Sequence, residues 1–270
     1  MLSKQIKRCT LLLLLIFMGC QPLDKLFTSP LPVQENNHQF KKRFYIPSDH
    51  YIDGKVPLSN HEKRANKYQH DYIIAGKTTT KKVALTFDDG PSMYTEKIIN
   101  KLNDYKIKAT FFMVGKSIKK YPDIVKKAYK SGHLIANHSW DHSNANNHQF
   151  LDKYWQEQIS STNKLIENIT GFTPSFFRPP YGSTSENIVE KLATNKMKTI
   201  IWSIDTQDWN IDINTAKNIA ITAIKHAHPE SIILMHDGGG NRQGTVDALD
   251  EIIQHYRQLN YQFVTIEELI

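Results

Sequence analysis

Short apolar runs alternate with longer amphipathic segments from Val83 to Ile266, and this alternation constrains the fold more than any other feature of the sequence. The apolar runs predict strands at 83–87, 109–114, 133–137, 176–178, 199–203, 231–235 and 263–266. The intervening segments predict helices at 94–105, 117–130, 150–169, 184–194, 214–226 and 246–259. Because parallel neighbours need a crossover connection, this pattern indicates a parallel sheet, and about seven strands suggest closure into a barrel. An open doubly wound sheet is the alternative, although no glycine-rich dinucleotide fingerprint follows the first strand.

The first predicted strand ends on two adjacent carboxylates, Asp88 and Asp89, which are followed by Gly90, Pro91 and Ser92. Side chains alternate across a strand, so neighbours in regular geometry face opposite sides of the sheet. Both acids can therefore serve one site only where the strand breaks into a loop. The simpler interpretation is a strand followed by an ordinary Asp-Gly turn.

Four further polar motifs follow or end later apolar runs. They are His138-Ser139-Trp140-Asp141-His142, Arg178-Pro179-Pro180-Tyr181-Gly182, Asp205-Thr206-Gln207-Asp208-Trp209 and Leu234-Met235-His236-Asp237. In a parallel barrel the carboxyl ends of the strands carry the active site. Every motif falls at such an end, and unrelated turn residues have no reason to collect His and Asp at one rim.

These five motifs, in this order, resemble those of the NodB-homology polysaccharide deacetylases, the fourth family of carbohydrate esterases. The resemblance covers residues 81–270, and the first motif (residues 86–92) with the unpermuted order resembles the peptidoglycan and chitooligosaccharide branch more than the permuted biofilm-polymer branch. The expected location at the cell's own wall then favours the peptidoglycan N-acetylglucosamine deacetylases. The resemblance implies a distorted (β/α)7 barrel, in agreement with the strand count. It also implies a metal-dependent hydrolase that acts on an acetylated polysaccharide.

Two imidazoles four residues apart, as in His138 and His142, can face the same side of a helical turn and bind one cation. A carboxylate is the expected third ligand, and Asp89 is the candidate. Such a set leaves an open position for water and substrate, as in catalytic zinc sites. The expected metal is zinc, with cobalt or nickel as alternatives. Non-haem Fe(II) also favours two His and one carboxylate, so an oxygenase is a competing interpretation, which the other motifs disfavour.

Metal-assisted hydrolysis needs a base to activate water and an acid for the leaving amine. The resemblance implies that Asp88 is the base and His236 the acid. It also implies that Arg178 pairs with Asp88 and lowers its carboxyl pKa, and that Asp208 lies against His236 and favours the imidazolium. Structural alternatives remain open, since a buried Arg–Asp pair can serve packing alone and Asp208 can cap the loop before the next helix.

The resemblance further implies how the substrate is bound. The backbone N–H of Tyr181 would stabilise the oxyanion, and Trp209 and Leu234 would form apolar walls around the acetyl methyl group. As aromatic and aliphatic residues at strand ends, Trp209 and Leu234 fit a hydrophobic core equally well. Asp205 has no assigned role, and Asp237 is expected to orient the loop that carries the acid.

The N-terminal residues have the pattern of a secretory signal. Basic residues at positions 4, 7 and 8 precede the apolar run Leu11 to Met18, which is shorter than the ~20 residues of a membrane span. The run leads to Cys20 in a sequence that resembles the lipobox of bacterial lipoproteins, although Phe17 replaces the usual Leu. Residues 1–20 are therefore interpreted as a signal peptide with a lipidated Cys20. An ordinary signal with an incidental cysteine is the alternative.

Residues 21–80 are polar and contain several prolines, which predicts a tether and an N-terminal extension before the catalytic domain at 81–270. Whether the more apolar part, residues 45–74, packs on the domain stays open. His50, His61 and His70 lack metal-like spacing and are expected to be solvated. Both cysteines of the chain lie in the leader, so the domain offers neither a disulfide nor a thiol ligand.

The formal net charge of +7 suits a polyanionic neighbour such as a cell-wall polymer or a membrane surface. Nucleic-acid binding is not expected, because the sequence has no Arg-rich or RNP-type aromatic cluster. We expect an exported, lipid-anchored monomer that faces the cell wall and removes N-acetyl groups from N-acetylglucosamine in peptidoglycan. Alternatives are a secreted form, an O-deacetylase of acetylated xylan or another esterified glycan, a chitooligosaccharide deacetylase, and a non-catalytic wall-binding lipoprotein.

Replacing Cys20 by Ser tests the leader. If Cys20 carries lipid, the Cys20→Ser protein is released into the medium or stalls in processing, because stable anchoring requires more than one acyl chain and the variant accepts none. Fractionation of membrane and medium measures the effect, with Cys9→Ser as the matched control. Wild-type protein found wholly in the medium would contradict the anchor.

Overall fold

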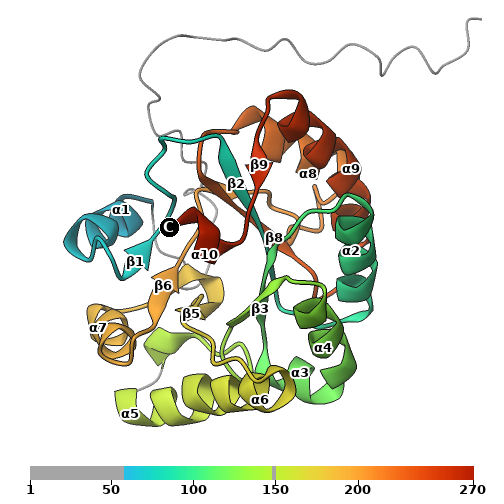
Figure 1. The fold of residues 1–270 in the computed structure, drawn as a ribbon. Coiled ribbons are helices and arrows are strands. Elements are labelled where there is room, and N and C mark those ends of the chain that lie inside the picture. The colour runs from blue at the N-terminus through green and yellow to red at the C-terminus, as the bar shows by residue number, and fades with distance from the viewer. Residues whose placement is uncertain (1–57, 148–149) are drawn as a thin grey trace, which may run out of the picture. The chain divides into compact units, whose positions relative to one another are not determined.

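The computed structural model describes residues 58–147 and 150–270, in which parallel strands curl around a common interior and helices cover the outside (Figure 1). The strands are β1 (Tyr72–Ile73), β2 (Lys82–Asp88), β3 (Thr110–Met113), β4 (Leu134–Asn137), β5 (Phe176–Phe177), β6 (Lys198–Ile200), β7 (Ile204–Asp205), β8 (Ser231–His236) and β9 (Gln262–Phe263). The α-helices are α1 (Leu58–Lys67), α2 (Met93–Asp104), α3 (Gly115–Lys120), α4 (Pro122–Lys130), α5 (Leu151–Tyr154), α6 (Ser161–Thr170), α7 (Glu186–Thr194), α8 (Ala216–Lys225), α9 (Gln243–Gln258) and α10 (Ile266–Leu269). Strand pairs in this sheet are parallel, and the predicted distorted (β/α) barrel is confirmed.

The sheet order is β1-β6-β5-β4-β3-β2-β8-β7, with β9 paired to the start of β2. Strand β2 is the centre of this arrangement, because it pairs with β8 along most of its length and with β3 near its end. The register places Asp88 opposite His236 on β8 and opposite Phe112 on β3. Two candidate catalytic side chains therefore lie on neighbouring strand ends.

Alternation along β2 divides its side chains between two cores. Val83, Leu85 and Phe87 point outward and belong to the larger cluster, which includes residues of α2 and α9. Ala84 belongs to a second cluster inside the curled sheet. Asp88 has the same parity as Ala84, so the strand delivers its carboxylate to the interior side.

The short helix α10 covers the N-terminal ends of the strands. The backbone N–H of Ile266 donates to Thr110 Oγ1 at the start of β3 over 3.0 Å, and Lys82 Nζ donates to the Glu268 carbonyl over 3.0 Å. A capping box between Thr265 and Glu268 begins the helix. Because apolar α10 side chains fill this end of the interior, the loops at the opposite, carboxyl ends of the strands frame the accessible end.

The structure corrects several predicted elements, among them the helix expected at 150–169, which contains a π-helical turn (Trp155–Ser160) between α5 and α6. The helix expected at 117–130 is divided, because Pro122 begins α4 and cannot donate a backbone hydrogen bond to the preceding turn. The strand expected at 199–203 is divided because the chain changes partners, with Ile201 N–H donating to Ile73 and Ser203 N–H to Ile232. The last strand ends at Phe263, before the capping residue of α10.

Residues 58–80 of the predicted N-terminal extension contain α1 and β1, and β1 adds to the sheet beside β6. Figure 1 shows both elements next to β6 and α7. The expectation that His61 is solvated is wrong, because its side chain is buried between α1 and β1. The signal peptide and Cys20 lie outside the described residues. Within the described ranges, no helix has the length and apolar character needed to cross a membrane.

Candidate active site

Asp88 ends β2, and its buried carboxylate is paired with the buried guanidinium of Arg178. Arg178 Nη1 donates to Asp88 Oδ1 over 2.7 Å and to Thr86 Oγ1 over 2.8 Å. Its other nitrogens donate to the carbonyls of Ile200 and Ile201, at the break between β6 and β7. Arg178 thus fixes one carboxylate oxygen of Asp88 while it satisfies backbone groups that the interrupted strand leaves exposed.

Burial raises the pKa of the Asp88 carboxyl above its ordinary value, and the nearby Arg178 guanidinium offsets only part of this rise. Arg178 lowers this pKa as expected, but burial has the larger effect and the net shift is upward. The cause is that the carboxylate is removed from water, which disfavours its charged form. A carboxyl with a raised pKa is a better proton acceptor near neutral pH than an exposed one.

Asp89 leaves the strand conformation, with a φ of 75°, and its side chain turns toward two histidines. Asp89 Oδ1 lies 3.5 Å from His138 Nε2 and 3.2 Å from His142 Nε2. Asp88 Oδ2 lies 3.7 Å from the same His138 nitrogen. The strand therefore breaks between the two acids, as the sequence requires if both are to serve one site.

His138 follows β4, and its Nδ1 lies 2.7 Å from the backbone carbonyl of Arg178. A carbonyl only accepts, so Nδ1 carries the proton and the lone pair of Nε2 faces Asp89. Burial lowers the pKa of His138 to about 3, which keeps the ring neutral, as a metal ligand must be. The helical turn expected between His138 and His142 is not formed. Instead a loop with positive φ at Ser139 and His142 folds the second imidazole back.

The Asp89, His138 and His142 side chains fit a divalent metal ion. Their ligand atoms all lie within 4.8 Å of one another. Asp89 Oδ1 is buried and has no hydrogen-bond partner among the described residues, a costly arrangement for a carboxylate unless a cation lies beside it. Two imidazoles and one carboxylate are a typical ligand set of catalytic zinc sites.

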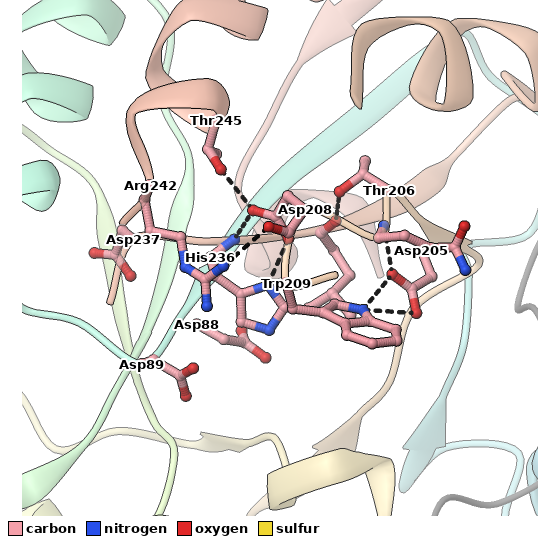
Figure 2. Close-up of polar contacts among 12 residues, drawn as sticks. Asp88, Asp89, Asp205, Thr206, Asp208, Trp209, His236, Asp237, Arg242 and Thr245 are labelled. Atoms are coloured by element: carbon pink, nitrogen blue, oxygen red, sulfur yellow. Dashed lines mark hydrogen bonds and ion pairs between the residues drawn. The ribbon is translucent and has the colours of Figure 1, made fainter. Parts of the chain in front are cut away.

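His236 ends β8 and forms a second close pair, with Asp208. Its Nδ1 lies 2.6 Å from Asp208 Oδ1, and its backbone N–H donates to Asp208 Oδ2 over 2.7 Å (Figure 2). Burial alone would lower the pKa of His236, but Asp208, together with the weaker contributions of Asp89 and Asp88, outweighs burial and the pKa rises to about 9. Contact with the imidazolium in turn lowers the pKa of Asp208 despite burial. His236 is therefore a cation at neutral pH.

Asp208 is held in place by two residues that the sequence analysis did not predict to belong to the site. Thr245, in the first turn of α9, donates its hydroxyl to Asp208 Oδ2 over 2.7 Å. Arg242 donates to the carbonyls of Asp208 and Gly238 over 2.9 and 2.7 Å. Figure 2 shows Thr245, Asp208 and His236 joined by consecutive contacts. The capping role considered for Asp208 is replaced by these bonds, and nothing in the local sequence distinguishes Thr245 from an ordinary helix residue.

A cavity of about 180 Å³ opens between the two pairs. Its lining residues come from every motif: Asp88, Asp89, His138, His142, Tyr181, Trp202, Asp205, Trp209, Leu234 and His236. Trp209 and Leu234 therefore both line the cavity, and Leu234 also belongs to the inner core cluster. Trp202 was not anticipated, because it lies in a predicted strand and reads as a core residue.

Tyr181 lies at the rim of this cavity, in a 3-10 turn (Pro180–Gly182) that follows β5. Its φ of 60° is rare for a bulky residue, so the surrounding structure must hold the turn in place. The N–H groups of Gly182 and Ser183 close the turn on the carbonyls of Pro179 and Pro180, each over 3.0 Å. The Tyr181 ring contacts His142 edge-on, with ring centres 4.6 Å apart.

Two further motif acids, Asp205 and Asp237, contact neighbouring groups. Asp205 Oδ1 accepts from the indole N–H of Trp209 over 3.2 Å, which orients that wall of the cavity. Asp237 accepts from Gly90 N–H and from the Thr95 hydroxyl, over 3.0 and 2.6 Å. Asp237 therefore orients the turn after Asp89, rather than the loop that carries His236 as expected.

Comparison with known proteins places this chain among deacetylases. A family model described as polysaccharide deacetylase matches residues 75–200. A peptidoglycan-N-acetylglucosamine deacetylase of Bacillus cereus is 35% identical over 235 residues, covering 83% of this chain and 82% of that protein. The peptidoglycan-N-acetylmuramic acid deacetylase PdaC of Bacillus subtilis is 35% identical over 83% of this chain, but the chain spans only 47% of its length. The crystal structure of the Bc1960 peptidoglycan N-acetylglucosamine deacetylase, solved with a naphthalenyl N-hydroxybenzamide, matches with a TM-score of 0.72 and 36% identity, covering 80% of this chain and 97% of that one.

The Asp208→Asn substitution tests the electrostatic pairing. Removing the carboxylate charge lowers the pKa of His236 from about 9 toward or below its ordinary value of 6.5, because burial then acts with less opposition. NMR titration of the His236 ring protons measures the change. Asp212→Asn, at an exposed carboxylate of the same loop, is the matched control and should leave the titration unchanged. A His236 pKa that stays near 9 in Asp208→Asn would refute the pairing.

Proposed function

Because this chain belongs to the polysaccharide deacetylase family, we propose that it removes N-acetyl groups from N-acetylglucosamine residues of peptidoglycan by metal-assisted hydrolysis. The observation that carries the proposal is the convergence of three sets of side chains on one cavity. A carboxylate paired with Arg178, a two-histidine and one-carboxylate ligand set, and an imidazolium paired with Asp208 all line it or lie directly behind its wall.

Asp88 is the group that takes a proton from the attacking water. Its Oδ1 is held by Arg178, whereas its Oδ2 faces the histidine cluster, 3.7 Å from His138 Nε2. Arg178 orients the carboxylate and balances its charge, while burial keeps the carboxyl pKa above its ordinary value. Positioned acid–base groups typically contribute ~10²–10⁴-fold to the rate.

His236 is the group that donates a proton to the leaving amine. Its Nδ1 is occupied by Asp208, so Nε2 is the nitrogen that can deliver the proton. With a pKa of about 9, the ring stays protonated at neutral pH, as an acid for an amine leaving group must. Asp88 and His236 are register partners on β2 and β8, so the proposed base and acid lie next to each other at neighbouring strand ends.

Asp89, His138 and His142 would hold zinc, with cobalt or nickel as alternatives. The bound ion would supply Lewis-acid polarisation of the acetyl carbonyl and would make water more acidic. The residues of this chain complete the site around it. The backbone N–H of Tyr181 would donate to the oxyanion that develops on the carbonyl, and Trp209 and Leu234 would enclose the acetyl methyl group.

The B. subtilis relative is named for deacetylation of N-acetylmuramic acid, which favours a second candidate function, removal of acetate from that sugar. An O-deacetylase of xylan or another esterified glycan uses the same acid–base groups, and acetate release from amide and ester substrates separates it from both. A chitooligosaccharide deacetylase would act on free oligomers instead of the wall. A non-catalytic wall-binding lipoprotein is disfavoured because all five motifs are intact.

The leader and the charge support the choice of peptidoglycan. A domain anchored through Cys20 by the polar tether predicted within residues 21–80 would meet the wall of its own cell before any foreign glycan. Wall polymers are largely anionic, and the full sequence has a formal net charge of +7, which favours attraction to them at low ionic strength. We therefore place the protein at the outer face of the cell membrane, acting as a monomer on glycan strands.

Metal removal tests the ligand set. A chelator should abolish acetate release, and zinc should restore it, because the ion supplies much of the transition-state stabilisation. His138→Ala should lower bound metal as well as rate, measured by elemental analysis of the purified protein. His255→Ala, on the distant end of α9, should change neither. Full activity in metal-free enzyme would refute the ligand assignment.

Deleting the gene tests the substrate. The fraction of glucosamine in the wall should fall and lysozyme sensitivity should rise. Muramidases that recognise the acetyl group bind a glycan with a free amine less well, and the deletion strain would have fewer free amines. Mass analysis of wall digests measures the deacetylated forms of both wall sugars, glucosamine and muramic acid. Wild-type protein should restore the glucosamine, whereas Asp88→Asn should not. A change in muramic acid alone would assign the second candidate function, and an unchanged wall with activity on free chitooligosaccharides would refute the peptidoglycan proposal.

A further inference from the structure

The N-terminal helix α1 precedes residues 75–200, which the polysaccharide deacetylase model matches, and yet it contacts the site. Its His61 side chain is only 1% exposed. His61 Nδ1 lies 2.5 Å from the hydroxyl of Tyr72 on β1, and the two rings stack with centres 6.1 Å apart. Histidine is not among the residue types that are most often fully buried, so the burial of His61 indicates a specific structural role.

The other side of His61 faces the active-site turn. Its ring centre lies 6.4 Å from that of Trp202, a residue that lines the cavity. A Cβ added at Gly182 would lie 2.9 Å from Trp202 Cη2 and 3.5 Å from His61 Cε1. Gly182 therefore packs its backbone directly on these two rings, and its φ of 65° independently favours glycine.

Side-chain bonds to α7 and backbone bonds of the adjoining β1 segment fix α1 in this position. Lys67 and Tyr68 bind Glu186 and Glu190 on α7 over 2.6 and 2.8 Å, at the surface. Backbone bonds from Thr199 and Ile201 to the 71–73 segment tie β1 to the β6 region. The α1 region therefore contacts both the Pro180–Gly182 turn, through His61, and the helix α7 that follows this turn in the chain.

We propose that His61 is a positioning residue for the reaction, and that α1 is a structural part of the active site. By supporting Gly182 and Trp202 from behind, His61 holds Tyr181 in its left-handed conformation and so fixes the direction of the Tyr181 backbone N–H. The expected effect on the reaction rate rests on the proposed deacetylase function, whereas the expected effect on the conformation of the turn does not.

His61→Ala in the full chain is the primary test. The N–H of Tyr181 is used in the transition state, so kcat and kcat/KM should fall together, by about ten- to a hundredfold, while KM stays within about threefold. Acetate release from an N-acetylglucosamine oligomer measures the rates, and bound metal should be unchanged. His61→Phe, which keeps a ring against Trp202 and Gly182, should recover most of the loss.

His133→Ala is the matched control. His133 is also buried, but it precedes β4 at the opposite ends of the strands, so its removal should destabilise the protein and leave kcat within about twofold. If His61→Ala fails to fold, Tyr72→Phe removes only the hydroxyl partner and should lower kcat by a smaller factor. Unchanged kcat in folded His61→Ala or Tyr72→Phe, or an equal loss in His133→Ala, would overturn the proposal.

Hydrogen exchange separates this proposal from the proposed function. In His61→Ala, the amides of Gly182 and Ser183, which close the turn, should exchange at least about tenfold faster than in the wild type, and in His133→Ala they should not. This readout needs no activity. An inactive wild-type enzyme would count against the deacetylase assignment, whereas unaltered exchange of the turn in His61→Ala would overturn only the role of His61.

Discussion

The buried ion pair between Arg178 and Asp88 is the interaction on which the rest of the site depends. Arg178 comes from the end of β5, Asp88 from the end of β2, and the carbonyls that Arg178 also binds lie where β6 gives way to β7. One guanidinium thus joins three parts of the curled sheet at the rim of its interior. Removing either charge would leave the other buried and unpaired, at a cost of about 3–5 kcal/mol. The pair also explains why the strand at 199–203 can break, because Arg178 satisfies the carbonyls that the break exposes.

Strand register converts this pairing into a catalytic arrangement. The parity of β2 directs Asp88 to the interior, and parallel pairing with β8 sets His236 beside it. A shift of one residue in either strand would move its charged end group to the face that packs against the helices. The apolar side chains of Val83, Leu85 and Phe87 prevent such a slip, since they fill the outer core only in the observed register. The hydrophobic core therefore determines the alignment of base and acid.

The sequence predicted the fold class and the motif residues because both depend on local pattern. Alternation of apolar runs with amphipathic segments requires parallel strands, and motif residues at strand ends meet at one rim. What the sequence did not predict depends on contacts between distant residues. Thr245 and Arg242 carry no local signal, because they contact Asp208 from 37 and 34 residues away in the sequence. The direction of the Asp88 pKa shift was missed because burial, which outweighs the neighbouring cation, cannot be read from residue order.

The two acid–base pairs of the site are built alike and yet tune their reactive groups for opposite tasks. Each joins a reactive side chain to a buried partner of opposite charge, but the balance between burial and partner differs. At Asp88, burial outweighs Arg178 and raises the carboxyl pKa, so the group accepts a proton more readily. At His236, the Asp208 carboxylate, together with the weaker contributions of Asp89 and Asp88, outweighs burial and raises the imidazole pKa, so the ring keeps its proton for delivery. Groups whose environments tune them for different steps are the physical signature of an acid–base catalyst, and here they stand on adjacent strands.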